Sequence, residues 1–130
     1  IISKYIELLK ALKDKYSLPL LTGKSSPTMI KKVFNDFQKG ALKIFAISDI
    51  GSYALDLPAA SIAIQLSGHY GSKQEEAQRL GRIMRPGKDK QAIFYTVVSQ
   101  NTIEQQYALK RQLFLSEQGY RYQVLRSKDL

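Results

Sequence analysis

The first apolar residues of the chain recur at helical spacing. Lysines fill the opposite side of the same helical projection, which predicts an amphipathic helix over residues 2–16. The apolar set is Ile2, Tyr5, Ile6, Leu9 and Leu12. The chain is therefore expected to begin inside a helix, without a strand that leads into it. Pro19 interrupts helical propagation, so the apolar run at residues 18–21 predicts a short buried strand.

A second helix is predicted where Ser26 precedes Pro27. A serine side chain can cap free backbone amides, and proline suits the first helical turn. The buried stripe of this helix consists of Ile30, Val33, Phe34 and Phe37. Gly40 is placed to end it. The apolar runs at residues 42–47 and 61–66 that follow have the length of strands.

The alternation of helix and strand continues beyond residue 70. Ser72 and Glu75 have the spacing of a capping box, which predicts a helix over residues 73–84 that ends before Pro86 and Gly87. The run at residues 92–98 is rich in β-branched and aromatic residues and predicts a strand.

The last part of the chain repeats the same signals. Thr102 and Gln105 again have capping-box spacing, and the helix that they open is expected to reach about Gln118 and to end at Gly119. Residues 120–125 predict a final strand.

Strands that alternate with helices predict an α/β fold with a mostly parallel sheet. Right-handed crossovers place helices on both faces of such a sheet, which makes three layers. The loops at the carboxyl ends of the strands then meet at one edge, where ligands of parallel sheets bind. The expected fold is therefore a three-layer parallel sheet that lacks its first strand.

Composition narrows the class of protein. The 130 residues, 44% of them apolar, suffice for one domain and exclude a second complete one. Twenty Lys and Arg against 11 Asp and Glu give a net charge of +9, which leaves a polyanionic partner and a merely solvated basic surface equally open. With no cysteine and one histidine, no thiolate or histidine metal cluster is expected. No apolar run approaches the roughly 20 residues of a membrane span, so we expect a soluble, intracellular domain without membrane association.

Three arginines lie within residues 78–85, at the end of the predicted helix over 73–84. Helical spacing puts Gln78, Arg82 and Arg85 on one face, where guanidinium groups could hold a phosphoryl group in bidentate contacts. Taken alone, such arginines more often form exposed salt bridges. The eight residues, however, match Gln-Arg-x-Gly-Arg-x-x-Arg, the motif VI pattern of superfamily 2 helicases. This resemblance implies that Arg82 and Arg85 are catalytic arginine fingers for ATP, and that Gln78 and Arg79 contact the nucleotide.

Residues 48–58 resemble motif V of the same helicases. The resemblance implies that Ser48 and its neighbouring amides contact a nucleic-acid phosphate, and that Asp56 reaches the nucleotide ribose or couples the two sites. A hydroxyl and amides hold a phosphate without reading a base, which suits a motor that travels over any sequence. Taken alone, the segment is a capped turn before Pro58. Ala54 stands where the commonest form of the motif has glycine.

Residues 21–26 correspond, by the same resemblance, to a loop that touches the nucleic-acid backbone at a helix N-terminus. Thr22, Gly23 and Lys24 are the expected contacts, because free amides and a lysine suit phosphate. Taken alone, a Gly-Lys-Ser loop is more often a plain turn. It is not a Walker A motif, since the Gly-x-x-x-x-Gly-Lys-Ser/Thr spacing is absent.

Residues 61–82 resemble the XPB branch of superfamily 2 DNA-repair helicases, and residues 94–99 and 110–120 resemble that family's C-terminal elements. The resemblance covers nearly the whole chain. It implies that residues 1–130 form the second RecA-like domain of a larger 3′-to-5′ helicase, with DNA, the N-terminal RecA-like domain of the same protein and other DNA-repair proteins as partners. The short connection at residues 86–91 favours a bacterial or archaeal, cytoplasmic protein over a nuclear one.

The sequence contains neither a Walker A motif nor an Asp-Glu-x-His box. We therefore expect ATP with Mg²⁺ to be held mainly by the N-terminal domain, and the isolated domain to be inactive. Two alternatives stay open. One is a non-catalytic RecA-like module that binds DNA or docks proteins, and the other is half of an RNA helicase, whose motif VI is similar.

Overall fold

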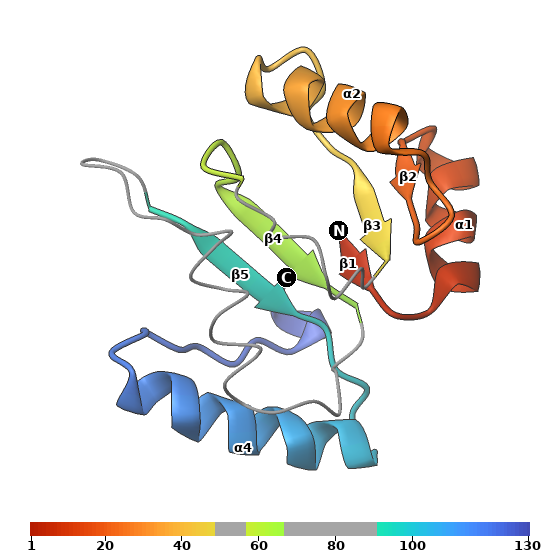
Figure 1. The fold of residues 1–130 in the computed structure, drawn as a ribbon. Coiled ribbons are helices and arrows are strands. Elements are labelled where there is room, and N and C mark those ends of the chain that lie inside the picture. The colour runs from red at the N-terminus through yellow and green to blue at the C-terminus, as the bar shows by residue number, and fades with distance from the viewer. Residues whose placement is uncertain (49–56, 67–90) are drawn as a thin grey trace.

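The computed structural model describes residues 1–48, 57–66 and 91–130 (Figure 1). These residues form strands joined by helices, in the alternation expected of an α/β fold. In chain order, the elements are β1 (Ile2–Ser3), α1 (Ile6–Tyr16), β2 (Leu20–Leu21), α2 (Pro27–Gln38), β3 (Ala46–Ser48), β4 (Ile62–Gln65), β5 (Ile93–Thr96), α4 (Ile103–Glu117) and the 3-10 turn η1 (Ser127–Asp129).

The strands of the described residues form one five-stranded sheet in the order β2-β3-β1-β4-β5. All four neighbouring pairs are parallel. The carboxyl ends of the strands therefore share one edge of the sheet, as the sequence predicted.

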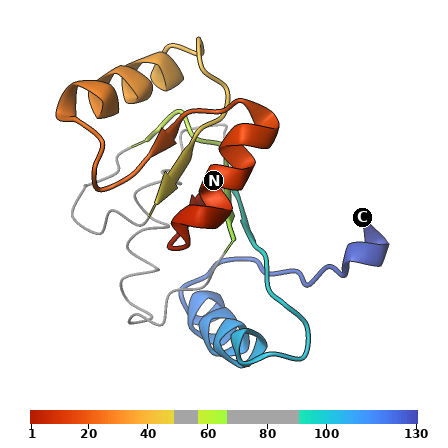
Figure 2. The same cartoon turned by 90° about the vertical axis from the view of Figure 1, so that its right-hand side faces the viewer.

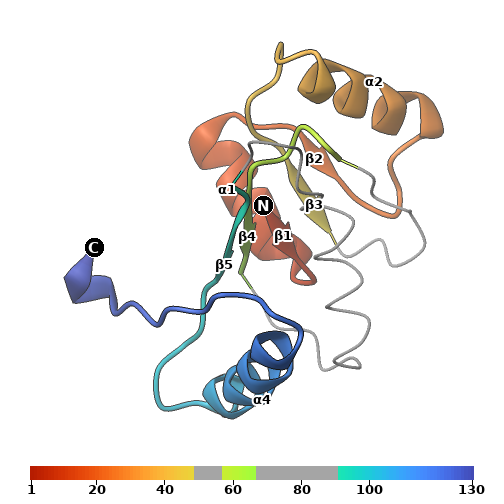
Figure 3. The same cartoon turned by 90° about the vertical axis from the view of Figure 1, so that its left-hand side faces the viewer.

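Helices cover both faces of this sheet. In β2 and β3, successive side chains point to opposite faces. Leu20 and Ala46 pack with Leu9 of α1, whereas Leu21 and Ile47 pack with α2 on the other face. Figures 2 and 3 show α1 and α2 on opposite sides of the strands. The three-layer arrangement is thus confirmed by where these side chains pack.

Helix α2 begins and ends where its sequence indicates. The Met29 N–H donates to Oγ of Ser26 (3.2 Å), so Ser26 is the N-cap, and Pro27 occupies the first turn. At the other end, Gly40 has a φ of +77°, a conformation that glycine adopts without strain. Both predicted boundaries are confirmed.

Helix α4 follows its predicted range but not its predicted cap. Thr102 is the N-cap residue, but its side chain caps no backbone amide, because Oγ1 donates to the Ser99 carbonyl instead (2.8 Å). Two side chains of the first helical turn accept hydrogen bonds from the preceding backbone instead. The Ser99 N–H donates to Oε2 of Glu104 (3.2 Å), and the Asn101 N–H donates to Oε1 of Gln105 (3.0 Å). The capping box expected at Thr102 is therefore wrong.

The helices of the described residues include none long and apolar enough to cross a membrane.

The expected absence of a first strand is also wrong. Ile2 and Ser3 form β1 at the centre of the sheet, between β3 and β4. The Ile47 N–H donates to the Ile1 carbonyl (2.8 Å), and the Leu66 N–H donates to the Ile2 carbonyl (2.9 Å). Hydrogen bonds to β3 and β4 thus hold Ile2 and Ser3 in a strand, although helical spacing had assigned Ile2 to a helix. Helix α1 starts only at Ile6.

The predicted final strand does not form. Residues 120–126 are exposed and have no regular secondary structure, and the chain then ends in η1. A β-rich run becomes a strand only where a sheet edge pairs with it, and the described residues provide no such pairing for this segment. The helix predicted over residues 73–84 lies outside the described residues.

Candidate functional site

Polar side chains stand at the carboxyl ends of all five strands. Ser3, Ser48, Gln65 and Thr96 are the last residues of β1, β3, β4 and β5, and Thr22 directly follows β2. They form a row along this edge, with Ser3 opposite Ser48 and Gln65 opposite Thr96. Gln65 itself lies opposite Ile2 of β1, so the two pairs point to opposite faces of the sheet. This edge is where parallel sheets bind ligands, so the row is the candidate site.

Ser3 and Ser48 lie side by side on the face of the sheet that α1 covers. Ser48 is two residues beyond Ala46, which packs with α1, and its register partner Ser3 points to the same face. The two residues are only 1% and 7% exposed, and Oγ of Ser3 accepts a hydrogen bond from the Tyr5 N–H (3.1 Å). Ser48 therefore offers a ligand little of its surface, while Ser3 ties the site to the start of α1.

The loop at residues 22–25 is held in a compact turn by its own hydrogen bonds. The Thr22 N–H donates to Oγ of Ser25 (2.9 Å), and the Ser25 N–H donates to the Thr22 carbonyl (2.9 Å). The Lys24 N–H donates to Oγ1 of Thr22 (3.2 Å). Thr22 is half-buried, whereas Gly23 and Lys24 are exposed.

These bonds change which groups of the loop can meet an anion. The amides of Thr22, Lys24 and Ser25 are already satisfied. In the part of the chain that the structure describes, the Gly23 amide donates to no acceptor, and a Cβ at this position would face open space. The Gly23 amide and the Lys24 ammonium are therefore the loop groups available to a phosphate, and Thr22 shapes the turn.

The amino group of Ile1 lies at the other end of β1. In a chain that starts at Ile1, this amino group donates to the Phe45 carbonyl (2.8 Å), and burial lowers its pKa from 8.0 to about 6. It is at the amino edge of the sheet and takes no part in the polar row.

The remaining predicted site residues, Asp56, Gln78, Arg79, Arg82 and Arg85, lie outside the described residues. The two segments that contain them follow the carboxyl ends of β3 and β4 along the chain. In the described ranges, no group of three His, Cys, Asp or Glu side chains could hold a metal ion.

Sequence reasoning missed three members of this row, Ser3, Gln65 and Thr96. Ser3 and Gln65 are at most 2% exposed, and both have hydrogen-bonding side chains in buried strand positions. A glutamine inside the apolar run at residues 61–66 was the available signal, because a buried amide needs a partner and marks a position with a structural or binding role. No comparable signal existed for Ser3, whose strand was not predicted.

A family model described as "ERCC3/RAD25/XPB C-terminal helicase" matches residues 1–129 of the chain. A protein of Kineococcus radiotolerans is 42% identical over 131 residues, and one of Mycobacterium tuberculosis is 40% identical over 131 residues. Both are named "DNA 3'-5' helicase XPB", and each match covers 100% of this chain and 24% of the relative. The chain thus spans about a quarter of the length of these relatives.

A more distant relative comes from Drosophila melanogaster. This "General transcription and DNA repair factor IIH helicase/translocase subunit XPB" is 37% identical over 131 residues, which cover 96% of this chain and 16% of the relative.

Two solved structures resemble the fold. The crystal structure of the C-terminal part of the Fun30 ATPase domain superposes with a TM-score of 0.66 at 16% identity, covering 98% of this chain and 40% of that one. The Sulfolobus solfataricus SWI2/SNF2 ATPase core domain superposes with a TM-score of 0.58 at 22% identity, covering 88% and 26%. Together with the parallel sheet, these likenesses confirm the RecA-like fold class.

Proposed function

Because the chain belongs to the ERCC3/RAD25/XPB C-terminal helicase family, we propose that it is the second motor domain of an ATP-dependent DNA helicase or translocase that acts in DNA repair. The observation that carries the proposal is the family match over residues 1–129, which includes the complete motif VI pattern at residues 78–85. In such a motor, two RecA-like domains close on ATP, and each supplies groups that the other lacks.

In this proposal, Arg82 and Arg85 are the arginine fingers. A guanidinium donates two parallel hydrogen bonds and keeps its charge at any physiological pH, so it stabilises the negative charge that develops in phosphoryl transfer. Gln78, Arg79 and Asp56 contact the nucleotide beside them. The sequence has no Walker A motif, so ATP with its Mg²⁺ is held mainly by the N-terminal RecA-like domain of the longer protein.

The carboxyl edge of the sheet supplies the contacts to DNA. The exposed Gly23 amide and the Lys24 ammonium bind a backbone phosphate, while Thr22 holds the loop in shape. Ser48 is buried beside Ser3 and contributes only at the edge of this contact. Such contacts ignore base identity, which fits movement along any sequence. We place the protein in the cytoplasm of a bacterium or archaeon, or in the nucleus if its source is a eukaryote.

The test uses the longer protein that includes the N-terminal domain. Arg85→Ala and Arg82→Ala should each lower the kcat of DNA-stimulated ATP hydrolysis by about 10³-fold or more, because an arginine finger contributes that much. The exposed Arg121 provides the matched control, and Arg121→Ala should leave kcat unchanged. Full activity in both finger variants would instead favour a RecA-like module with no part in hydrolysis. Stimulation by RNA but not by DNA would favour the RNA-helicase alternative.

A further inference from the structure

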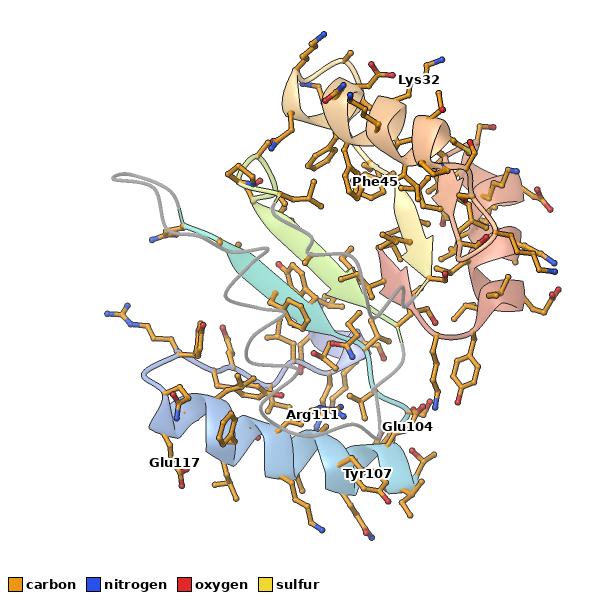
Figure 4. The ribbon with its side chains drawn as sticks, in the orientation of Figure 1. Lys32, Phe45, Glu104, Tyr107, Arg111 and Glu117 are labelled. Carbon is orange, nitrogen blue, oxygen red and sulfur yellow. The ribbon has the colours of Figure 1, made fainter. Side chains whose placement is uncertain are left out.

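The outer face of α2 carries a stripe of hydrogen-bond donors. Thr28, Lys32, Asn35 and Lys39 follow one another at spacings of four, three and four residues, which places them on one side of the helix. All four are exposed, and the buried side of the helix is opposite, at Ile30 and Val33. Figure 4 shows Lys32 on the side of α2 that points away from Phe45 and the sheet. We call these four residues the α2 outer stripe.

Positive charge concentrates around this stripe. Residues 22–43 contain five lysines and one aspartate, a net charge of +4 out of +9 for the whole chain. The lysines are Lys24, Lys31, Lys32, Lys39 and Lys43, and all are exposed. By contrast, α4 has two basic and two acidic residues and no net charge. Among the segments that the structure describes, the one around α2 therefore carries the largest net positive charge.

These lysines are not neutralised by neighbouring carboxylates. None of the five forms an ion pair with the residues in the described ranges, whereas Lys10 on α1 pairs with Glu7 (3.0 Å). The single acidic residue of α2, Asp36, is half-buried. It lies four residues after Lys32 and three before Lys39, but it forms no ion pair with either lysine. Exposed ammonium groups without a carboxylate partner keep their full attraction for an anion.

We propose that the α2 outer stripe is a second contact for the DNA phosphate backbone, next to the loop at residues 22–25. This inference rests on the proposed function. The stripe begins in the first turn of α2, shortly after the loop, and spans the 12 residues from Thr28 to Lys39. Their 11 steps along the helix rise about 16 Å. That length matches the rise of about five base pairs. A backbone that is held at Gly23 and Lys24 therefore continues along donors that fit phosphate oxygens.

The experiment compares matched charge losses on two faces of the 130-residue chain. Lys32→Gln/Lys39→Gln removes both ammonium groups of the stripe, and Lys13→Gln/Lys15→Gln removes two exposed lysines from α1. Affinity for a fluorescent DNA duplex with a single-stranded tail is measured by anisotropy between 50 and 200 mM salt. Each lost phosphate contact should lower the slope of log K against log salt by about 0.9. Over this fourfold change in salt, the wild type should therefore lose about 12-fold more affinity than the stripe variant.

The α1 variant should keep the wild-type slope, and Lys32→Arg/Lys39→Arg should restore it. All four positions are exposed, so unchanged thermal unfolding verifies that each variant is folded. Equal slopes for the stripe and α1 variants would overturn the inference. The inference would also be overturned if the stripe variant lost binding to polyglutamate but kept its binding to DNA, because the α2 outer stripe would then fit an acidic protein.

Failure of the inference and failure of the proposed function are distinguishable. If Lys24→Gln weakens DNA binding but the stripe variant does not, the loop binds DNA and only the second contact is wrong. If the wild type binds no DNA even at 50 mM salt and DNA does not stimulate the longer protein, the proposed function fails, and the inference fails with it.

Discussion

Phe45 provides the sharpest test of how α2 is held on the sheet. Its side chain is only 6% exposed, directly before β3. The ring lies 5.8 Å from that of Phe34 and 5.1 Å from that of Phe37, and the second pair is edge-on with an interplanar angle of 80°. Phe34 and Phe37 belong to α2, so these aromatic contacts join the helix to the sheet.

Phe45→Ala should destabilise the domain by about 4 kcal/mol. Truncation of a buried phenylalanine costs about 3–5 kcal/mol, and each aromatic pair accounts for about 0.5–1.5 kcal/mol beyond the area that it buries. For 130 residues, the unfolding entropy is about 0.27 kcal/mol per kelvin, so the loss corresponds to a fall in Tm of about 15 °C.

The measurement is urea unfolding of the 130-residue chain, followed by circular dichroism, together with a thermal scan. Ile44 is the matched control, because it is the preceding residue and is 56% exposed. Ile44→Ala should cost less than about 1 kcal/mol. A loss below about 1.5 kcal/mol for Phe45→Ala, or equal losses for both variants, would refute the packing argument. A double-mutant cycle with Phe37→Ala should give a coupling of about 0.5–1.5 kcal/mol, and additive losses would show that the two rings do not interact.

Three further outcomes follow from local geometry. Gly119 has a φ of +89°, so Gly119→Ala should lower the free energy of unfolding in urea by about 1–2 kcal/mol. Gly23 is the control: it has no positive φ and a Cβ there would face open space, so Gly23→Ala should change this free energy by less than about 0.5 kcal/mol. Ser26→Ala removes the N-cap of α2 and should cost about 1 kcal/mol, whereas Ser26→Asp should retain the cap; equal losses would contradict the capping role. In a chain released from a tag with Ile1 as its first residue, the amino group has a pKa of 8.0 when unfolded and about 6 when folded. The unfolded state therefore binds more protons between these values, so the free energy of unfolding should rise from pH 6 to pH 8 by about 2 kcal/mol, and acetylation of the amino group should abolish the rise.

The polar row at the carboxyl edge was only partly predictable. Of its members, Thr22 and Ser48 were predicted as contacts, because loop and motif signals lie in adjacent residues. The hydrogen bonds inside the loop, which satisfy the Thr22 and Lys24 amides and leave that of Gly23, depend on the fold of the turn and had no sequence signal. The burial of Ser48 beside Ser3 was equally out of reach, because it depends on a strand that the sequence did not reveal.

The amino-acid sequence by itself determined the elements whose signals are local. Ser26, Pro27 and Gly40 set the limits of α2 through contacts within four residues along the chain, and the same is true of Gly119 after α4. The family resemblance, which the match over residues 1–129 confirms, likewise depends on contiguous motifs.

Tertiary structure alone decided the two ends of the chain. Ile2 and Ser3 are a strand only because Ile47 and Gln65 lie on either side of them, and no residue near them in sequence announces this. Residues 120–125 have the composition of a strand but form none, since a strand needs the hydrogen bonds of a distant neighbour. A helix satisfies its backbone from within, whereas the backbone of a strand must find its partners elsewhere in the chain.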